Sequence, residues 1–394
     1  MSPALWRGWV AAALLLCIQQ VAALEATISA EYRGAASGRF TNTTPLASYC
    51  LQWPADCVGA QAAALPITYT KKATKGATDP RDQFYVKVPG VREIDVYHEL
   101  TGESHRMKFE ITAISQMVQW PLGANPVMTT QVRGGCRYRR TYGWPATPSR
   151  ALYLWSVSSP QAPGGCYSIT DRMQPGYEAT PPVSEMGIAY NLDMPPPYRM
   201  KPGIYSGSIT YSIGPGGDFD FGSDVTDLNG NSLTLNFRLD VQHAFVFDFP
   251  PGSDRAVLEP TGGWRNWLGG RGAPPRLYRD LPFRLWSTGP FKVYTLCSLY
   301  VGGLCGMRNG SGHEVPVDVA LSLPGGIEHQ GRPVHRLPMP IGRGQALAFD
   351  SVMPTLNRPG QLHFQVGPEP VKTMLDHAGS TYNGLVTVVF DSEL

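Results

Sequence analysis

The chain has 394 residues, with 33 Lys and Arg against 31 Asp and Glu and a formal net charge of +2. Nucleic-acid binding needs a basic excess gathered on one face, so this balance argues against a nucleic-acid partner. After the first segment, no uninterrupted apolar run approaches the roughly 18 residues that span a bilayer, which argues against stable membrane insertion.

Residues 1–23 are predicted to be a secretory signal peptide. Arg7 supplies a basic start, residues 10–16 form an apolar run, and residues 21–23 are small enough for cleavage. A lipoprotein site at Cys17 is a weaker alternative, because Leu16 stands where such a site needs a small residue. The sequence therefore predicts export to the periplasm, with a mature chain from Leu24.

Six cysteines remain after Cys17, and an even number in an exported chain favours disulfides over thiols. Proximity along the chain predicts the pairs Cys50–Cys57, Cys136–Cys166 and Cys297–Cys305. A zinc site is the alternative, but these spacings differ from those of zinc knuckles and no His stands nearby. We predict no metal and no cofactor.

Short runs of β-branched and aromatic residues recur between Gly, Pro, Asn and Asp, and several alternate with a period of two. Predicted strands cover residues 84–88, 107–112, 151–155, 207–213, 233–239 and 316–323. Long helical patterns are nearly absent. This pattern predicts an all-β protein built from sandwiches or barrels.

The length favours two domains, and the junction is placed near Val241. The strand at 233–239 is followed by a new apolar strand at 244–249, which Pro250 and Pro251 end. We therefore expect an N-terminal β domain over 24–240 and a C-terminal domain over 241–394. The Pro-rich stretches at 181–182 and 195–197 are expected to form an inserted loop or strap.

A strongly apolar strand is predicted at 385–390, close to the end of the chain. Val386, Val388 and Phe390 fall on one face, and Leu385, Thr387 and Val389 fall on the other. The chain stops four residues after this strand. Either the strand pairs only with earlier strands, or its sheet needs a strand from another molecule.

Three motifs together resemble chaperone–usher fimbrial subunits. Tyr382, Gly384, Val386 and Val388 before a short acidic end are similar to the C-terminal strand of these subunits. Residues 260–263 resemble the start of the pilin domain in two-domain tip proteins of the colonisation-factor and cable-pilus type. Residues 205–218 resemble the last strand region of the first domain in fimbrial adhesins.

This resemblance implies an N-terminal β-sandwich, lectin-like adhesin domain followed by an incomplete immunoglobulin-like pilin domain. A periplasmic chaperone lends the missing strand, and an adjacent subunit replaces it at the outer-membrane usher, which is a form of β-augmentation. The residues expected at the acceptor groove are Leu385, Val386, Val388, Val389 and Phe390, with the Leu394 carboxylate as an anchor for a chaperone cation.

The alternating residues Leu24, Ala26 and Ile28 have two interpretations. As a donor arm they would fill the groove of another subunit. As the first strand of the N-terminal domain they would leave the chain able to accept a strand but not to donate one. The second interpretation, which we favour, places the protein outside the cell at the tip of the fimbrium.

A ligand site is predicted inside the Cys136–Cys166 loop. Its candidate residues are Arg137, Tyr138, Arg139, Arg140, Tyr142 and Trp144. Arg offers a planar fork of donors to carboxylates, and aromatic faces pack against sugars, so the pattern suits an acidic glycan. The colonisation-factor adhesins are similar in using an exposed Arg cluster. The alternative is a strand with a solvated basic face.

Two weaker candidates remain. Trp264 and Trp267 form either a sugar platform or a packed loop, and the acidic run from Asp218 to Asp227 is either a calcium site or a strand edge with its turn. No catalytic motif is present, so we predict no enzyme activity. The predicted function is a tip adhesin that binds a surface carbohydrate. The alternatives are a structural or assembly-initiating fimbrial subunit without a ligand, and a secreted β-rich hydrolase.

Overall fold

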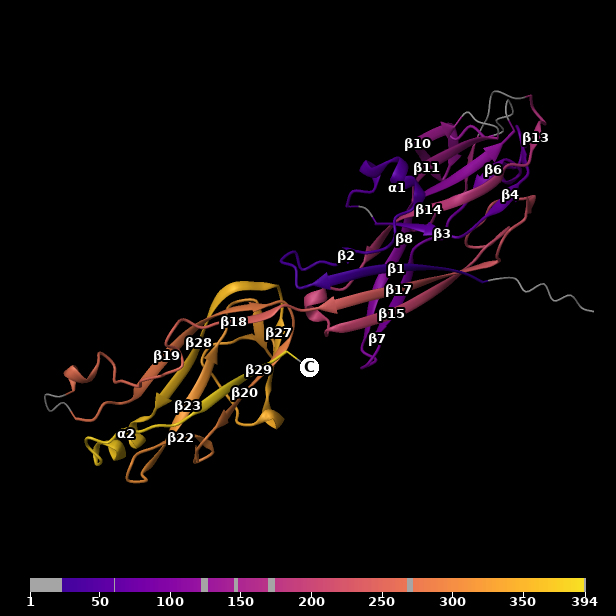
Figure 1. Ribbon diagram of the computed structural model, residues 1–394. Helices are drawn as coiled ribbons and strands as arrows, with labels where there is room; N and C mark the ends of the chain where they lie inside the picture. The colour runs from indigo at the N-terminus through magenta and orange to yellow at the C-terminus, as the bar shows by residue number, and fades with distance from the viewer. Residues whose placement is uncertain are drawn as a thin grey trace, which may run out of the picture.

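The computed structural model describes residues 23–59, 61–121, 127–144, 148–168, 174–267 and 272–392. Nearly all of the predicted signal peptide, and Leu394, lie outside these ranges. The described chain is an all-β protein, as predicted, with two large hydrophobic cores that share no residue. Figure 1 shows the two parts of the chain as two groups of strands. Within these ranges, no helix has the length and apolar character of a membrane span.

The N-terminal part contains β1 (Ala23–Arg33), β2 (Thr41–Asn42), α1 (Ser48–Gln52), η1 (Pro54–Asp56), β3 (Gln61–Leu65), β4 (Tyr69–Lys71), β5 (Ala73–Thr74), η2 (Pro80–Asp82), β6 (Phe84–Val86), β7 (Arg92–His98), β8 (Ser104–Trp120), β9 (Val132–Gly134), β10 (Cys136–Trp144), β11 (Ser149–Val157), β12 (Cys166–Ser168), β13 (Glu178–Ala179), β14 (Pro182–Asp193), η3 (Pro197–Arg199), β15 (Gly203–Ser212), β16 (Val225–Thr226) and β17 (Ser232–Gln242). The second Pro of the 181–182 stretch thus begins a strand, whereas residues 195–197 lie in a connection that ends in η3.

The long strand β8 organises the N-terminal part. Its first half pairs with β7, its second half pairs with β11, and β14 follows its other edge. The edge strand β10 lies outside β11. At the far side of the sheet, β1 runs parallel to β17 from the pair Ala23–Ser232 to the pair Arg33–Gln242. Residues 24–28 are therefore an integral strand of this sheet.

The C-terminal part contains β18 (Phe245–Asp248), η4 (Trp264–Asn266), β19 (Leu277–Ser287), β20 (Phe291–Cys297), β21 (Tyr300–Val301), β22 (Leu304–Arg308), β23 (Glu314–Ser322), β24 (Ile327–His329), β25 (Arg332–Pro333), β26 (Leu337–Pro338), η5 (Arg343–Gln345), β27 (Leu347–Ser351), β28 (Thr355–Val366), α2 (Pro368–Leu375) and β29 (Val386–Asp391). One sheet has the order β18–β19–β28–β23–β22–β21, and the other has the order β25–β24–β27–β20–β29. Side chains from both sheets form one core, as in a β-sandwich.

Three disulfides join the residue pairs that sequence proximity predicts: Cys50 with Cys57, Cys136 with Cys166, and Cys297 with Cys305. The first closes the short α1–η1 segment, and the second links β10 to β12. The third links the end of β20 to β22, next to the start of β29. Two of the three disulfides therefore lie at the segments that carry the predicted sites.

The two parts meet at His243 and Ala244, directly after β17. The His243 Nε2–H donates to the carbonyl oxygen of Met200 at 2.8 Å, and the ring lies 5.8 Å from the Tyr32 ring. The Ala244 N–H donates to Thr288 Oγ1 at 2.8 Å. His243 thus contacts the N-terminal part, while the next residue is bonded to the C-terminal part.

Acidification is expected to weaken this junction. Burial lowers the pKa of His243 below its usual 6.5, although its hydrogen bonds to backbone carbonyls act in the opposite direction. His243 therefore binds a proton more readily in the unfolded chain than in the folded chain, so the free energy of unfolding falls as the pH drops below about 6.5. Gln can still donate to Met200 but takes up no proton in this pH range. Between pH 7.5 and pH 5.5, the free energy of urea unfolding should therefore fall less in His243→Gln than in the wild type. Equal losses in both proteins would contradict this.

Candidate functional site

β29 is an edge strand. It pairs antiparallel with β20 from Cys297–Val386 to Lys292–Asp391, and among the described residues no strand pairs with its other edge. The predicted strand therefore lies where expected, and its missing second partner is a feature of the described fold.

The backbone groups on the open edge of β29 can be identified from its neighbour. The Thr295 N–H donates to Pro340, and the Thr295 carbonyl accepts from Gly342, both at 2.9 Å. Thr295 therefore directs its backbone groups away from β29, and its partner Val388 must direct its own away from β20. By alternation, Val386 and Phe390 also present their N–H and C=O groups at the open edge.

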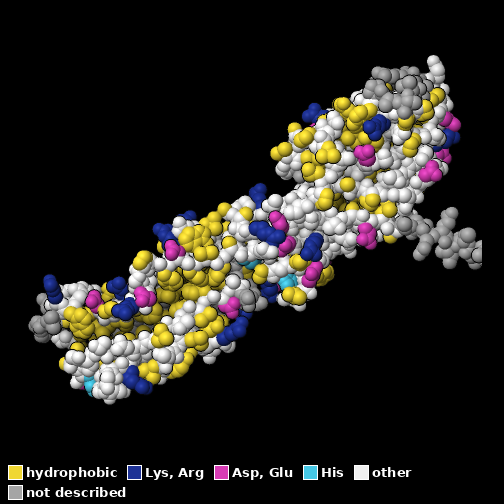
Figure 2. All heavy atoms as spheres, viewed as in Figure 1, with side chains coloured by type: hydrophobic (Ala, Val, Ile, Leu, Met, Phe, Trp, Pro, Cys, Tyr) yellow, Lys and Arg dark blue, Asp and Glu magenta, His cyan; other side chains and the backbone are white. Residues whose placement is uncertain are grey.

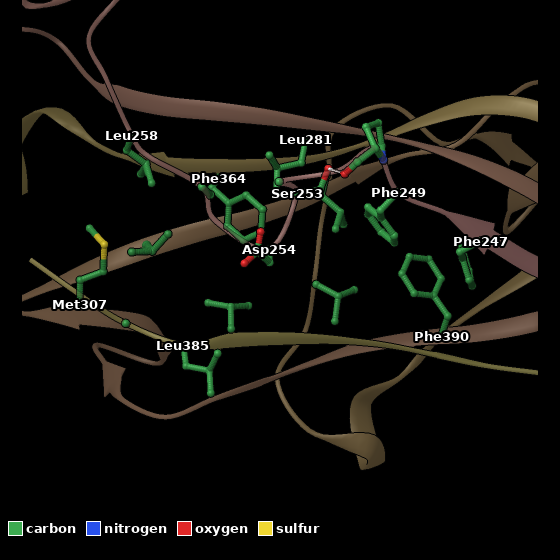
Figure 3. Close-up of a pocket in the computed structure, with 18 residues that line it drawn as sticks. Phe247, Phe249, Ser253, Asp254, Leu258, Leu281, Met307, Phe364, Leu385 and Phe390 are labelled. Atoms are coloured by element: carbon green, nitrogen blue, oxygen red, sulfur yellow. Dashed lines mark hydrogen bonds between the residues drawn. The ribbon is translucent and has the colours of Figure 1, made fainter.

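An apolar groove of about 770 Å³ lies beside this edge. One rim is β29 and the other is residues 249–258, while β19, β23 and β28 form the floor (Figure 3). Its lining consists of Phe247, Phe249, Pro250, Gly252, Ser253, Asp254, Ala256, Leu258, Leu281, Met307, Val317, Leu362, Phe364, Gly384, Leu385, Val386, Val388 and Phe390. Figure 2 shows hydrophobic side chains gathered along a hollow in the C-terminal part.

Both ends of the groove are defined by packing. At one end the Phe390 ring lies 4.0 Å from that of Phe247, centroid to centroid. At the other end, Gly384 is so close to β22 that a Cβ atom would lie 2.3 Å from the Gly306 carbonyl oxygen. Between these ends β29 offers six residues, a length of about 20 Å for an extended strand. The groove therefore has the length and the open backbone groups for one short strand.

The predicted groove residues have three outcomes. Val386, Val388 and Phe390 line the groove, and Leu385 lines it too because it precedes the regular strand. Val389 alternates to the opposite face of β29 and is not part of this lining, so its expected place at the acceptor groove stays a prediction. Leu394 lies outside the described residues, so its expected contact with a cation stays a prediction.

The predicted ligand residues lie on the edge strand β10, with a bulge between Tyr138 and Arg140. Arg139 and Arg140 both form ion pairs with the largely buried Asp56, at 2.8 and 3.0 Å. These two guanidinium groups therefore hold η1 against β10. Arg137 is exposed, and no ion pair of it is found among the described residues.

The aromatic residues of β10 are divided between its two faces. On β11, Leu152 lies opposite Tyr142 and Arg150 lies opposite Trp144. The ring centroids of Tyr142 and Trp144 are 4.6 Å apart. The Arg150 guanidinium lies 5.0 Å from the Trp144 ring centroid, an arrangement that sequence inspection missed. Tyr138 is opposite Trp155 and so faces the other side. Arg137, Tyr142, Trp144 and Arg150 share one face of the β10–β11 pair.

Replacing Asp56 with Ala is expected to lower the free energy of unfolding by about 1 kcal/mol, because two charge-assisted contacts with β10 are lost while both Arg side chains remain solvated. Glu178→Ala, which removes the exposed partner of Lys72, is the matched control and should have a smaller effect. Urea unfolding of both variants measures the difference. An Asp56→Ala protein as stable as the control would mean that these ion pairs contribute nothing.

The two weaker candidates have structural partners. Trp264 lies exposed in η4, and the Trp267 indole N–H donates to the Thr261 carbonyl at 3.3 Å, so both belong to a loop closed on itself. In the acidic run, Asp218 pairs with Arg92 and Asp220 pairs with Arg81. Within the described ranges, no three His, Cys, Asp or Glu side chains gather as a metal site.

Three solved structures of fimbrial proteins show similarity to this chain. No family model and no curated protein matches the sequence. A chaperone–tip adhesin complex of CFA/I fimbriae is similar over 82% of this chain and 83% of that one, at 11% identity and a TM-score of 0.26. A mutant of the CFA/I adhesin CfaE of enterotoxigenic E. coli is similar over 94% and 92%, at 10% identity and a TM-score of 0.27.

The CsuC–CsuE chaperone–tip subunit complex of the archaic Csu pili of Acinetobacter baumannii is similar over 94% of this chain and 99% of that one, at 10% identity and a TM-score of 0.23.

Proposed function

We propose that this protein is a minor fimbrial subunit at the tip of a pilus, whose C-terminal domain, residues 241–394, accepts a β-strand from another polypeptide. The observation that carries the proposal is the open edge of β29 beside a groove lined by apolar side chains. The occupants are a periplasmic chaperone during export and then an adjacent subunit, joined at an outer-membrane usher. The mature protein is extracellular.

An added strand would stabilise this edge in two ways. It would pair with the outward N–H and C=O groups of Val386, Val388 and Phe390, and its side chains would cover the groove floor. An open apolar edge is otherwise a site for aggregation, which proteins normally protect. Strand addition combines backbone hydrogen bonds for affinity with side-chain pockets for specificity.

The tip position is supported by the pairing of β1. Residues 24–28 are hydrogen-bonded along β17 inside the N-terminal sheet, so this segment is not available to fill the groove of another subunit. Such a chain accepts a strand without donating this segment. A structural or assembly-initiating subunit shares this property, and only ligand binding by the N-terminal domain, residues 24–240, distinguishes it from an adhesin.

Strand acceptance can be tested with a synthetic peptide. Its nine residues alternate between Val and Thr, and a Gly-Ser-Glu tail follows them. We expect this peptide to raise the Tm of the full chain and to slow amide exchange at Val386, Val388 and Phe390. A peptide of the same composition with paired valines is the control, because its apolar side chains cannot all face the groove. Full protection of these amides in the peptide-free protein would contradict the proposal.

The N-terminal domain is proposed to bind an acidic carbohydrate through β10. Arg137 and Arg150 offer guanidinium groups, and Tyr142 with Trp144 offers aromatic surface on the same face. Glycan arrays with the full chain should show binding of sialylated glycans that Arg137→Ala and Trp144→Ala each weaken about tenfold, a change of about 1.4 kcal/mol. Arg238→Ala, an exposed change on β17, is the control. Unchanged binding in both test variants would remove this site, and turnover of a glycan would favour a hydrolase.

A further inference from the structure

The apolar groove contains a single acidic side chain. Among the described residues that line it, Asp254 is the one ionisable residue, and the others apart from Ser253 are apolar or glycine. Figure 3 shows Asp254 between Phe249 and Leu258 on the rim that faces β29. Among the described lining residues, Asp254 is therefore the one charged group available to a strand in the groove.

The backbone before Asp254 is held in a defined turn. The Ser253 N–H donates to the Pro250 carbonyl at 3.2 Å, and the Ser253 hydroxyl donates to the same oxygen at 2.7 Å. The hydroxyl of Ser253 thus already has an acceptor. Asp254 is exposed, and within the described part of the chain it has neither an ion pair nor a hydrogen bond. The Asp254 carboxylate is therefore accessible to solvent.

A strand that fills the groove would reduce the contact of this carboxylate with solvent. A strand paired with the open edge of β29 would lie between β29 and the rim that carries Asp254, and its side chains would face lining residues such as Leu281 and Leu362. A carboxylate that loses water without gaining a partner is strongly destabilising. A Lys or Arg on the incoming strand would replace the water with a charge-assisted hydrogen bond. An acidic residue at the same place would add repulsion.

We infer, on the basis of the strand acceptance proposed above, that the natural occupant of this groove carries a basic residue among its alternating apolar residues and that this residue pairs with Asp254. The partner is thus an extended protein segment with both features. The ion pair sets the register of the strand and rejects acidic segments, since specificity needs a repulsive element as well as an attractive one. The apolar side chains still supply most of the affinity.

The test uses the full chain and variants of the alternating Val–Thr nonapeptide, with Lys or Glu placed in turn at each of the five central positions. Titration calorimetry should find at least one position at which Lys binds about tenfold more tightly than Glu. Added salt should reduce the preference. Asp254→Asn should abolish it, and Asp254→Lys should reverse it. Asp248→Asn is the matched control, because Asp248 is exposed on β18 but does not line the groove.

The possible failures are distinguishable. If Lys and Glu peptides bind the wild type equally at every position while the parent peptide still binds, the inference is overturned and strand acceptance stands. A preference that survives in Asp254→Asn also overturns it, because another group would be responsible. If the parent peptide does not bind at all, both the proposed function and the inference fall.

Discussion

Replacing Val388 with Asp is expected to weaken binding of the alternating Val–Thr peptide about a hundredfold or more. Val388 lies in the middle of β29, and its side chain lines the groove. A carboxylate there would lose its water when a strand packs over it, at a cost of about 3 kcal/mol or more. The groove is open to solvent without an occupant, so the variant should still fold. Titration calorimetry with the full chain measures the effect.

The neighbouring residue provides a matched control. Thr387 is exposed and points to the opposite face of β29, so Thr387→Asp introduces the same charge one residue away without touching the groove. Its peptide affinity should stay within about threefold of the wild type, since surface changes seldom exceed 0.5 kcal/mol. If both variants lose binding equally, the groove face is not the recognition surface, and strand acceptance in this form is wrong.

The C-terminal strand shows which features of the site sequence periodicity can predict. A period of two placed Val386, Val388 and Phe390 on one face, and these are the β29 residues that line the groove. Periodicity does not identify which face is buried, and Val389, on the other face, is not part of this lining, so its role at the groove stays a prediction. Leu385 lines the groove against the alternation because the chain has not yet entered the regular strand, and such strand ends depend on contacts with residues distant in sequence.

The rest of the groove depends on long-range pairing. Its floor comes from β19, β23 and β28, and its second rim comes from residues 249–258, more than a hundred residues before β29. Pro250 and Pro251 did indicate that a strand ends there, since Pro cannot donate to a sheet ladder. No local pattern indicates that residues 252–258 line the same groove as β29. Asp254 was therefore not predicted as part of the site.

The basic strand β10 shows a different limit. Its composition suggested a ligand site with three Arg, yet Asp56 occupies two of them from a position more than eighty residues earlier. The bulge between Tyr138 and Arg140 lets both adjacent Arg reach one carboxylate, although neighbouring residues on a regular strand point to opposite faces. The partner, the bulge and the contribution of Arg150 all follow from the tertiary structure.

Replacing Arg81 with Leu is expected to destabilise the N-terminal part by about 3 kcal/mol. Arg81 makes two hydrogen bonds to the Asp220 carboxylate, at 2.5 and 3.0 Å, and the Asp220 side chain is only 4% exposed. Without Arg81 this carboxylate would be buried with little compensation, the case in which breaking an ion pair is most costly. Nearby, the fully buried Lys71 donates to the carbonyl oxygens of Arg81 and Ser223, so the loss should loosen both loops.

The pH dependence distinguishes this mechanism from a general packing defect. In the wild type, burial raises the pKa of Asp220, but the bonds from Arg81 and the Gly222 N–H outweigh it and lower the pKa. Its stabilising contribution is therefore complete above the unfolded value near 4 and is lost only as the pH falls below it. In Arg81→Leu, burial should raise the pKa of Asp220, so the loss of stability relative to wild type should shrink as the pH is lowered from 7 toward 5.

Arg92→Leu is the control. It breaks the more exposed pair with Asp218 and should lower the free energy of unfolding by less than about 1 kcal/mol. An Arg81→Leu deficit that is the same at pH 7 and pH 5 would mean that Asp220 is not the group left uncompensated.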